Sequence, residues 1–77
     1  MNDKKNIRQS PHSIKAEKAV LGCMLLNKDA VSKATQLLTK DSFYESAHQI
    51  IFESIMELSN TQQTIDNITV IDFLEKN

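Results

Sequence analysis

Three side chains in the sequence could take part in a Cys–His nucleophile or in a His- and Cys-ligated metal site: two histidines, His12 and His48, and one cysteine, Cys23. A metal site needs three or four ligands, and neither H-x-x-x-H nor H-E-x-x-H occurs. A Cys–His pair would indicate nucleophilic catalysis. Cys23, however, lies in the apolar part of a predicted helix, where a thiol is usually an inert small hydrophobe. We expect His48 to pack or hydrogen-bond at a helix start, so the sequence predicts no catalytic residue and no metal ligand.

Phosphate and nucleic-acid chemistry are also disfavoured by the composition. The chain has a single glycine, Gly22, whereas a phosphate-binding loop needs two glycines and a dinucleotide fingerprint three. The formal net charge is −1, from nine Lys and Arg against ten Asp and Glu, which is unlike a strongly basic DNA-binding domain. Phe43 and Tyr44 could stack on a base, but Asp41 and Glu45 flank them, which favours anchoring in a core.

The sequence indicates a cytoplasmic protein. The longest stretch without a polar side chain, Ala19 to Leu26, is far shorter than the ~20 residues that span a bilayer. No secretory signal fits around it. A single cysteine excludes an internal disulfide bond. We therefore expect no membrane partner.

Apolar periodicity predicts helices that would position these residues. Residues 1–12 are expected to form a flexible arm, and Ser13 to cap a helix over 13–26, with Gly22 allowing a close helix crossing. A short second helix should begin at Asp29 and bury Leu37 among other residues. Asp29, Asp41 and Asp66 lie at predicted helix boundaries, where capping explains them. The expected apolar faces are Ile14, Val20, Leu21, Met24 and Leu25 in the first helix and Ala30, Val31, Ala34, Leu37 and Leu38 in the second.

The second half of the chain predicts two further helices. Ser46 and Gln49 match a capping box that opens a helix over about 46–59. A polar loop over 59–64 follows, and Thr69 with Asp72 resembles a weaker capping box. The expected inward residues are Ile51, Phe52, Ile55 and Leu58 in the third helix and Val70, Phe73 and Leu74 in the fourth. The fold class predicted is all-α, a small orthogonal bundle of about four helices that is incomplete at the C-terminus.

An ordered set of short motifs resembles a known family. Residues 11–22 read PHSIKAEKAVLG, and they are followed by Phe43-Tyr44, by His48 with Ile51-Phe52, and by Ile65-Asp66 with Ile68-Thr69-Val70. Together they resemble the start of the bacterial replicative DNA helicase of the DnaB type, which reads P-H-S-x-E-A-E-x-x-V-L-G, D-F-Y, H-x-x-I-F and I-D-x-I-T. The resemblance covers residues 10–74. It departs from the pattern at Lys15, where the family has an acidic residue, and at the serine between Asp41 and Phe43.

The resemblance implies a function in DNA replication. Residues 13–77 would be part of the family's N-terminal helical domain, a non-catalytic scaffold that joins helicase subunits and receives primase or a helicase loader. The hexameric helicase would bind ATP, Mg²⁺ and DNA through a separate motor domain, so this chain would hold no cofactor and would not itself be an enzyme.

The residues expected to matter are structural, and two other functions stay open. One alternative is a stand-alone helical adaptor or DNA-binding regulator, for which the lysines are too dispersed; another is a Cys–His enzyme. The structural residues are Ser13 and Ser46 as helix starts, Leu21, Leu25, Phe43, Ile51, Phe52 and Ile55 as core, Gly22 at a helix crossing and Tyr44 as an aromatic anchor.

Overall fold

The computed structural model describes residues 11–76, and within this range the chain forms four α-helices, one 3₁₀ turn and no strand. The elements are α2 (Pro11–Leu26), α3 (Lys28–Leu37), η1 (Lys40–Ser42), α4 (Ser46–Asn60) and α5 (Asn67–Lys76). The all-α prediction is confirmed. Most of the arm predicted over 1–12 lies outside the described residues, and Pro11 and His12 belong to α2.

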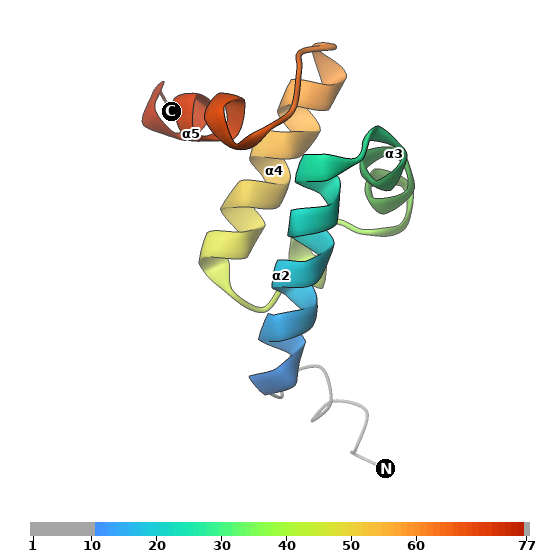
Figure 1. Ribbon diagram of the computed structural model, residues 1–77. Coiled ribbons are helices and arrows are strands. Elements are labelled where there is room, and N and C mark those ends of the chain that lie inside the picture. The colour runs from blue at the N-terminus through green and yellow to red at the C-terminus, as the bar shows by residue number, and fades with distance from the viewer. Residues whose placement is uncertain (1–10, 77) are drawn as a thin grey trace.

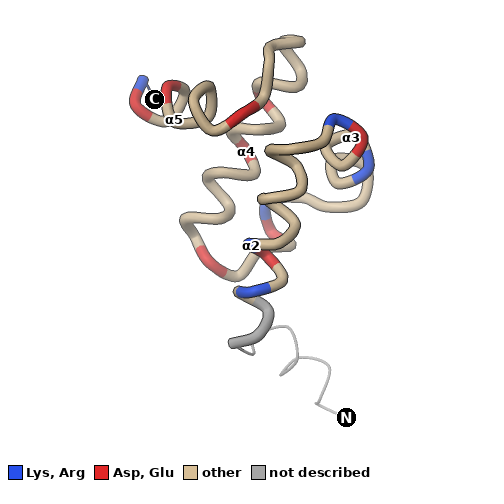
Figure 2. Tube along the Cα trace, in the orientation of Figure 1, with Lys and Arg blue, Asp and Glu red and all other residues tan. Residues whose placement is uncertain are grey.

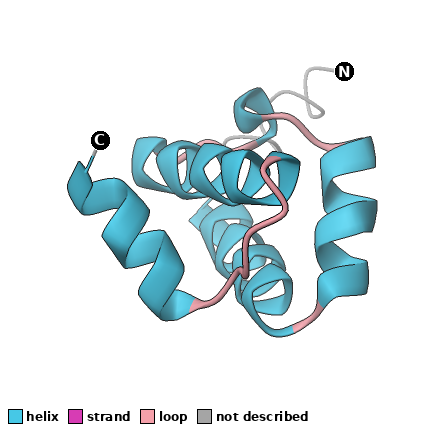
Figure 3. Cartoon of the chain, turned by 90° about the horizontal axis from the view of Figure 1, so that it is seen from above, coloured by secondary structure: helices cyan, strands magenta, loops and turns pink. Residues whose placement is uncertain are grey.

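The helices cross one another at steep angles around a small centre. Figure 1 shows α2 and α4 side by side, with α3 turning away from the end of α2 and α5 lying across the end of α4. The view from above (Figure 3) shows the same four helices enclosing one centre, joined by short loops. This is the small orthogonal bundle that the sequence predicts.

The core lies where α2, α3, α4 and α5 meet. Phe52 and Ile55 on α4 are completely buried, and the ring of Phe52 packs against that of Phe43 with centroids 5.0 Å apart. The predicted core residues Leu21, Phe43, Phe52 and Ile55 are therefore confirmed, while Leu25 and Ile51 are only partly buried against them. The full set of buried apolar residues is Leu21, Met24, Val31, Ala34, Phe43, Phe52, Ile55, Leu58 and Val70.

Two residues predicted to pack inside are exposed, and the helix crossing predicted at Gly22 does not form. Leu37 is 80% exposed and Tyr44 is 57% exposed. Leu37 ends α3 and the extended residue Leu38 turns inward instead; Phe43 is likewise extended, so its neighbour Tyr44 points the opposite way. A Cβ added to Gly22 would meet nothing within 4 Å. The prediction of a close helix crossing at Gly22 is therefore wrong.

Both serines predicted to cap helices lie inside them. Helix α2 begins at Pro11, a favoured first residue because proline has no amide hydrogen to satisfy, so Ser13 is in the first turn. Helix α4 has Glu45 at its cap position and Ser46 as its first helical residue. The predicted capping box with Gln49 does not form, because the Gln49 side chain donates to the carbonyl oxygen of Phe43 at 2.8 Å.

Two other helices are capped earlier than predicted, α3 by two residues and α5 by three. Asn27, which ends α2, also caps α3: its side-chain oxygen accepts from the backbone amide of Asp29 at 2.7 Å. Before α5, Asp66 and Thr69 each accept from the other's backbone amide at 2.9 Å. Asp66 therefore caps α5, as its place at a helix boundary suggested, and the predicted start at Thr69 is wrong.

Candidate functional site

The most concentrated polar chemistry in the described residues is a buried cluster around the carboxylate of Glu17. Helix α2 presents Glu17 to the beginning of α4, where its Oε1 lies 2.6 Å from Nδ1 of His48. The same carboxylate accepts the backbone amides of Tyr44 and of Glu45. Because a carboxylate only accepts, Nδ1 of His48 must carry the hydrogen. Both residues are only 7% exposed, so the cluster is shielded from solvent.

The environment of Glu17 favours its charged form. Burial by itself raises the pKa of the carboxyl, but the hydrogen bonds from His48 and from the Tyr44 and Glu45 amides outweigh this effect and hold the pKa below its ordinary value. The two amides come from the residues just before α4, where a helix start favours negative charge. Glu17 therefore fixes the turn that leads into α4, whose cap residue Glu45 has no side-chain capping bond of its own. The expectation that His48 hydrogen-bonds at a helix start is confirmed.

The geometry does not support a Cys–His catalytic pair. Cys23 is exposed, so the prediction that it packs as a small hydrophobe is wrong, while His48 is buried with Nδ1 committed to Glu17. Among residues 11–76 no group of three or more His, Cys, Asp or Glu side chains could hold a metal ion. No buried side-chain nitrogen or oxygen in that part of the chain lacks a hydrogen-bond partner. The buried polar groups thus serve the fold.

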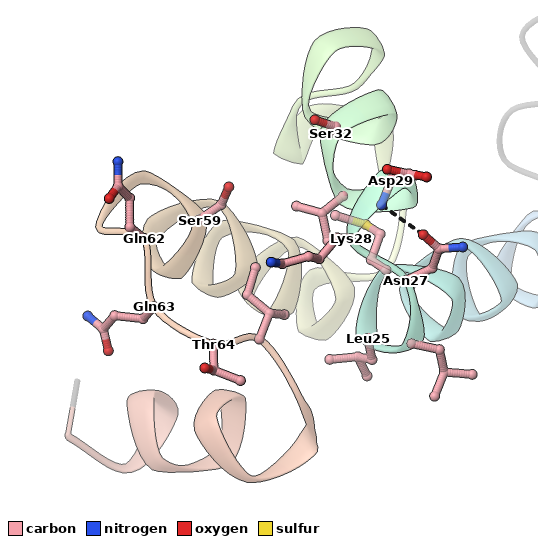
Figure 4. Close-up of a pocket in the computed structure, with 13 residues that line it drawn as sticks. Leu25, Asn27, Lys28, Asp29, Ser32, Ser59, Gln62, Gln63 and Thr64 are labelled. Carbon is pink, nitrogen blue, oxygen red and sulfur yellow. Dashed lines mark hydrogen bonds between the residues drawn. The ribbon is translucent and has the colours of Figure 1, made fainter.

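One surface hollow of about 670 Å³ lies where the α2–α3 corner faces the loop between α4 and α5. Figure 4 shows amide and hydroxyl side chains around it, with Asn27 bonded to the amide of Asp29. The Gln63 side chain in its wall donates to Thr61. These bonds hold the corner and the loop in place. The charged side chains around the hollow are Lys28 and Asp29, next to each other at the start of α3.

A second hollow, here named the α4–α5 groove, runs between those two helices. It has a volume of about 910 Å³. Its apolar wall contains residues of both helices, and two exposed carboxylates stand on α4. The defining residues are Ile50, Met56, Phe73 and Leu74 with Glu53 and Glu57.

Charge is divided unevenly between the two halves of the described chain. Residues 45–76 contain six Asp and Glu and one Lys, a formal charge of −5, whereas residues 11–44 contain five Lys and three Asp and Glu, a formal charge of +2. Figure 2 shows the lysines spread over α2, α3 and the turn after α3. The lysines are therefore dispersed, as the sequence indicated, and the acidic groups belong mainly to α4, α5 and their flanks. Within residues 11–76, no helix combines the length and the apolar content that a membrane crossing requires.

Comparison with known proteins assigns the family. The family model of the DnaB-like helicase N terminal domain matches residues 9–77. The replicative DNA helicase DnaB of Treponema pallidum is 45% identical over 64 residues, which cover 83% of this chain and 15% of that protein. The DnaB of Rhodothermus marinus is 36% identical, covering 90% of this chain and 7% of that protein, and the replicative DNA helicase DnaC of Bacillus subtilis is 37% identical, covering 91% and 15%.

The chain thus spans less than a sixth of the length of each of these three relatives. No solved structure matches it at a significant level. The resemblance read from the ordered motifs over residues 10–74 is confirmed, since the family model matches residues 9–77. This chain belongs to the family of DnaB-like helicase N terminal domains.

Proposed function

We propose that the chain is a non-catalytic scaffold of a hexameric replicative DNA helicase, binding helicase subunits and presenting a surface to primase or to a helicase loader in the cytoplasm. The observation that carries this proposal is the family match over residues 9–77. The buried chemistry agrees with it, because Glu17 and His48 bond to each other and to the start of α4. Those groups stabilise the bundle and leave its outer faces for partners.

We further propose that catalysis belongs to a separate motor domain. The relatives are named as replicative helicases and are much longer than this chain. ATP and Mg²⁺ would bind to that motor, which would also carry the contact with DNA. The present chain would then contribute neither a cofactor site nor an enzymatic step.

The test uses the 77-residue chain with purified primase, loader and full-length helicase from the same genome. Surface plasmon resonance should detect binding of the chain to at least one of these proteins, and the chain should neither hydrolyse ATP nor be retained on DNA. A matched comparison uses an unrelated helical domain of similar size and charge at the same density on the sensor. Absence of binding to all three proteins, together with salt-dependent retention on duplex DNA, would instead support the DNA-binding regulator.

A further inference from the structure

The α4–α5 groove continues into an apolar surface that nothing in the described chain covers. Ile68 and Ile71 on α5 are 76% and 55% exposed, and Ile50 on α4 is 55% exposed. Residues three apart on a helix lie on neighbouring positions of its surface. Ile68, Ile71 and Leu74 therefore form a line that leads from solvent to the half-buried wall of the groove.

Helix α5 consequently has two apolar faces. One contains Val70, which is buried in the core, and Phe73, which packs against the core. The other contains Ile68 and Ile71 and faces outward. A single isolated apolar residue on a surface is ordinary, whereas adjacent apolar residues beside a groove are typical of a binding surface.

Around this surface, carboxylates outnumber lysines by four to two, so its charge is negative overall. Glu53 and Glu57 stand one turn apart on α4, and Asp72 and Glu75 lie on α5. Lys76 pairs with Asp72 at 3.1 Å, and Lys40 approaches Glu53 only at 3.9 Å, with both side chains about half exposed. Two carboxylates at this spacing repel each other by a few tenths of a kcal/mol, and a cation placed beside them would remove that repulsion.

We infer that the α4–α5 groove binds a basic amphipathic helix of a partner protein. The apolar side of that helix would lie on Ile50, Ile71 and Leu74, and its Lys or Arg side chains would meet Glu53 and Glu57. Helix α5 has ten residues and is thus about 15 Å long, so a partner helix of about 14 residues, about 21 Å, is enough to cover it. Helix-in-groove recognition of this kind uses apolar anchors at i, i+3, i+4 and i+7. The inference deepens the proposed scaffold function and rests on it for the biological setting.

The experiment titrates the ¹⁵N-labelled 77-residue chain with three synthetic 14-residue peptides. One has leucines at the anchor spacing and lysines elsewhere, one has glutamates in place of the lysines, and one has the composition of the first in scrambled order. The basic amphipathic peptide should bind at least about tenfold more tightly than either control at low salt. Its chemical-shift changes should concentrate on Glu53, Glu57 and Ile71.

Matched variants separate the groove from the rest of the surface. Ile71→Gln should weaken binding about tenfold. Leu37→Gln, which alters an apolar residue on α3 that is more exposed than Ile71, should not change binding. Glu57→Gln should weaken binding about threefold, while Asp41→Asn in the η1 turn should have no effect. All four positions are exposed, so each variant is expected to fold, and circular dichroism verifies this.

Three results would overturn the inference. The first is equally tight binding of the acidic and basic peptides, and the second is a set of chemical-shift changes confined to α2 and α3. The third is a groove occupied by a second copy of the chain, which would be seen as self-association that Ile71→Gln abolishes and that the basic peptide does not change. The synthetic peptides contain no replication protein. Their failure would therefore leave the scaffold proposal standing, and their success would not rescue that proposal if primase, loader and helicase all failed to bind.

Discussion

Replacing Glu17 by glutamine tests whether the buried carboxylate holds α2 to the start of α4. The substitution keeps the shape of the side chain and one acceptor oxygen but removes the charge that receives hydrogen bonds from His48, Tyr44 and Glu45. A hydrogen bond to a charged group contributes ~1.5–3 kcal/mol, against ~0.5–1.5 kcal/mol for a neutral one. With three such bonds, the expected loss in the free energy of unfolding is about 3 kcal/mol.

That loss would be large for a chain of this size, whose total stability is expected to be about 4–12 kcal/mol. Urea denaturation at pH 7, followed by circular dichroism at 222 nm, measures it. The midpoint should fall by about 3 M if the slope is about 1 kcal/mol/M. The control is Glu53→Gln, which removes an exposed carboxylate with one ion pair at 3.9 Å and should cost less than about 1 kcal/mol.

A double-mutant cycle makes this test specific. If Glu17 acts partly through His48, Glu17→Gln should cost less in a His48→Gln background than in the unmodified chain, because the bond between them is already lost. Equal losses for Glu17→Gln and Glu53→Gln would refute the reasoning. They would mean that the buried cluster adds no more to stability than a surface ion pair does.

Three further outcomes follow from the same structure. Because the pKa of Glu17 is lowered in the folded chain, the unfolded chain binds more protons in acid. The contribution of Glu17 to the free energy of unfolding should therefore be complete above about pH 4.5, its ordinary pKa, and shrink below that pH. The urea midpoints of the unmodified chain and of Glu17→Gln should converge as the pH falls. Gly22→Ala should raise the free energy of unfolding by about 0.5–1 kcal/mol, because glycine is unfavourable inside a helix and the added methyl group would meet no atom within 4 Å. A decrease in the free energy of unfolding would instead show a close contact at this position. Ile55→Ala should lower it by about 2–5 kcal/mol, because this side chain is completely buried; a loss below 1 kcal/mol would place the core elsewhere.

Sequence reasoning succeeded where many residues contribute to one signal. The apolar period of α4 predicted that Phe52 and Ile55 face inward, and both are completely buried. A period spread over a whole helix tolerates one misleading residue. The period is least informative at the ends of a helix. Leu37 and Leu38 were both predicted to face inward, but the helix ends at Leu37 and only Leu38 packs against the core.

Helix starts were predicted less well because they depend on single hydrogen bonds. Ser46 and Gln49 have the correct spacing for a capping box, yet the Gln49 side chain donates to Phe43 instead. The amide of the cap residue Glu45 donates to Glu17, which lies on another helix. Glu17 and His48 are 31 residues apart, so no local pattern joins them. The available signal was that Glu17 and His48 each lie in a motif of the family pattern. Those motifs identify the family, but they do not say which of their residues touch.

The acidic half of the domain shows how total composition conceals a surface property. A net charge of −1 is almost neutral, yet residues 45–76 alone carry −5, and the exposed Ile50 and Ile71 lie among those charges. Counting residue types cannot reveal this, because placement on a face depends on how α5 crosses α4. Because every buried side-chain nitrogen and oxygen of the described fold has a hydrogen-bond partner, contacts with other proteins depend on the outer faces, which differ in charge and in exposed apolar area. Those two properties are the ones that a scaffold uses to choose its partners, so the α4–α5 groove is the place where such a choice is best sought.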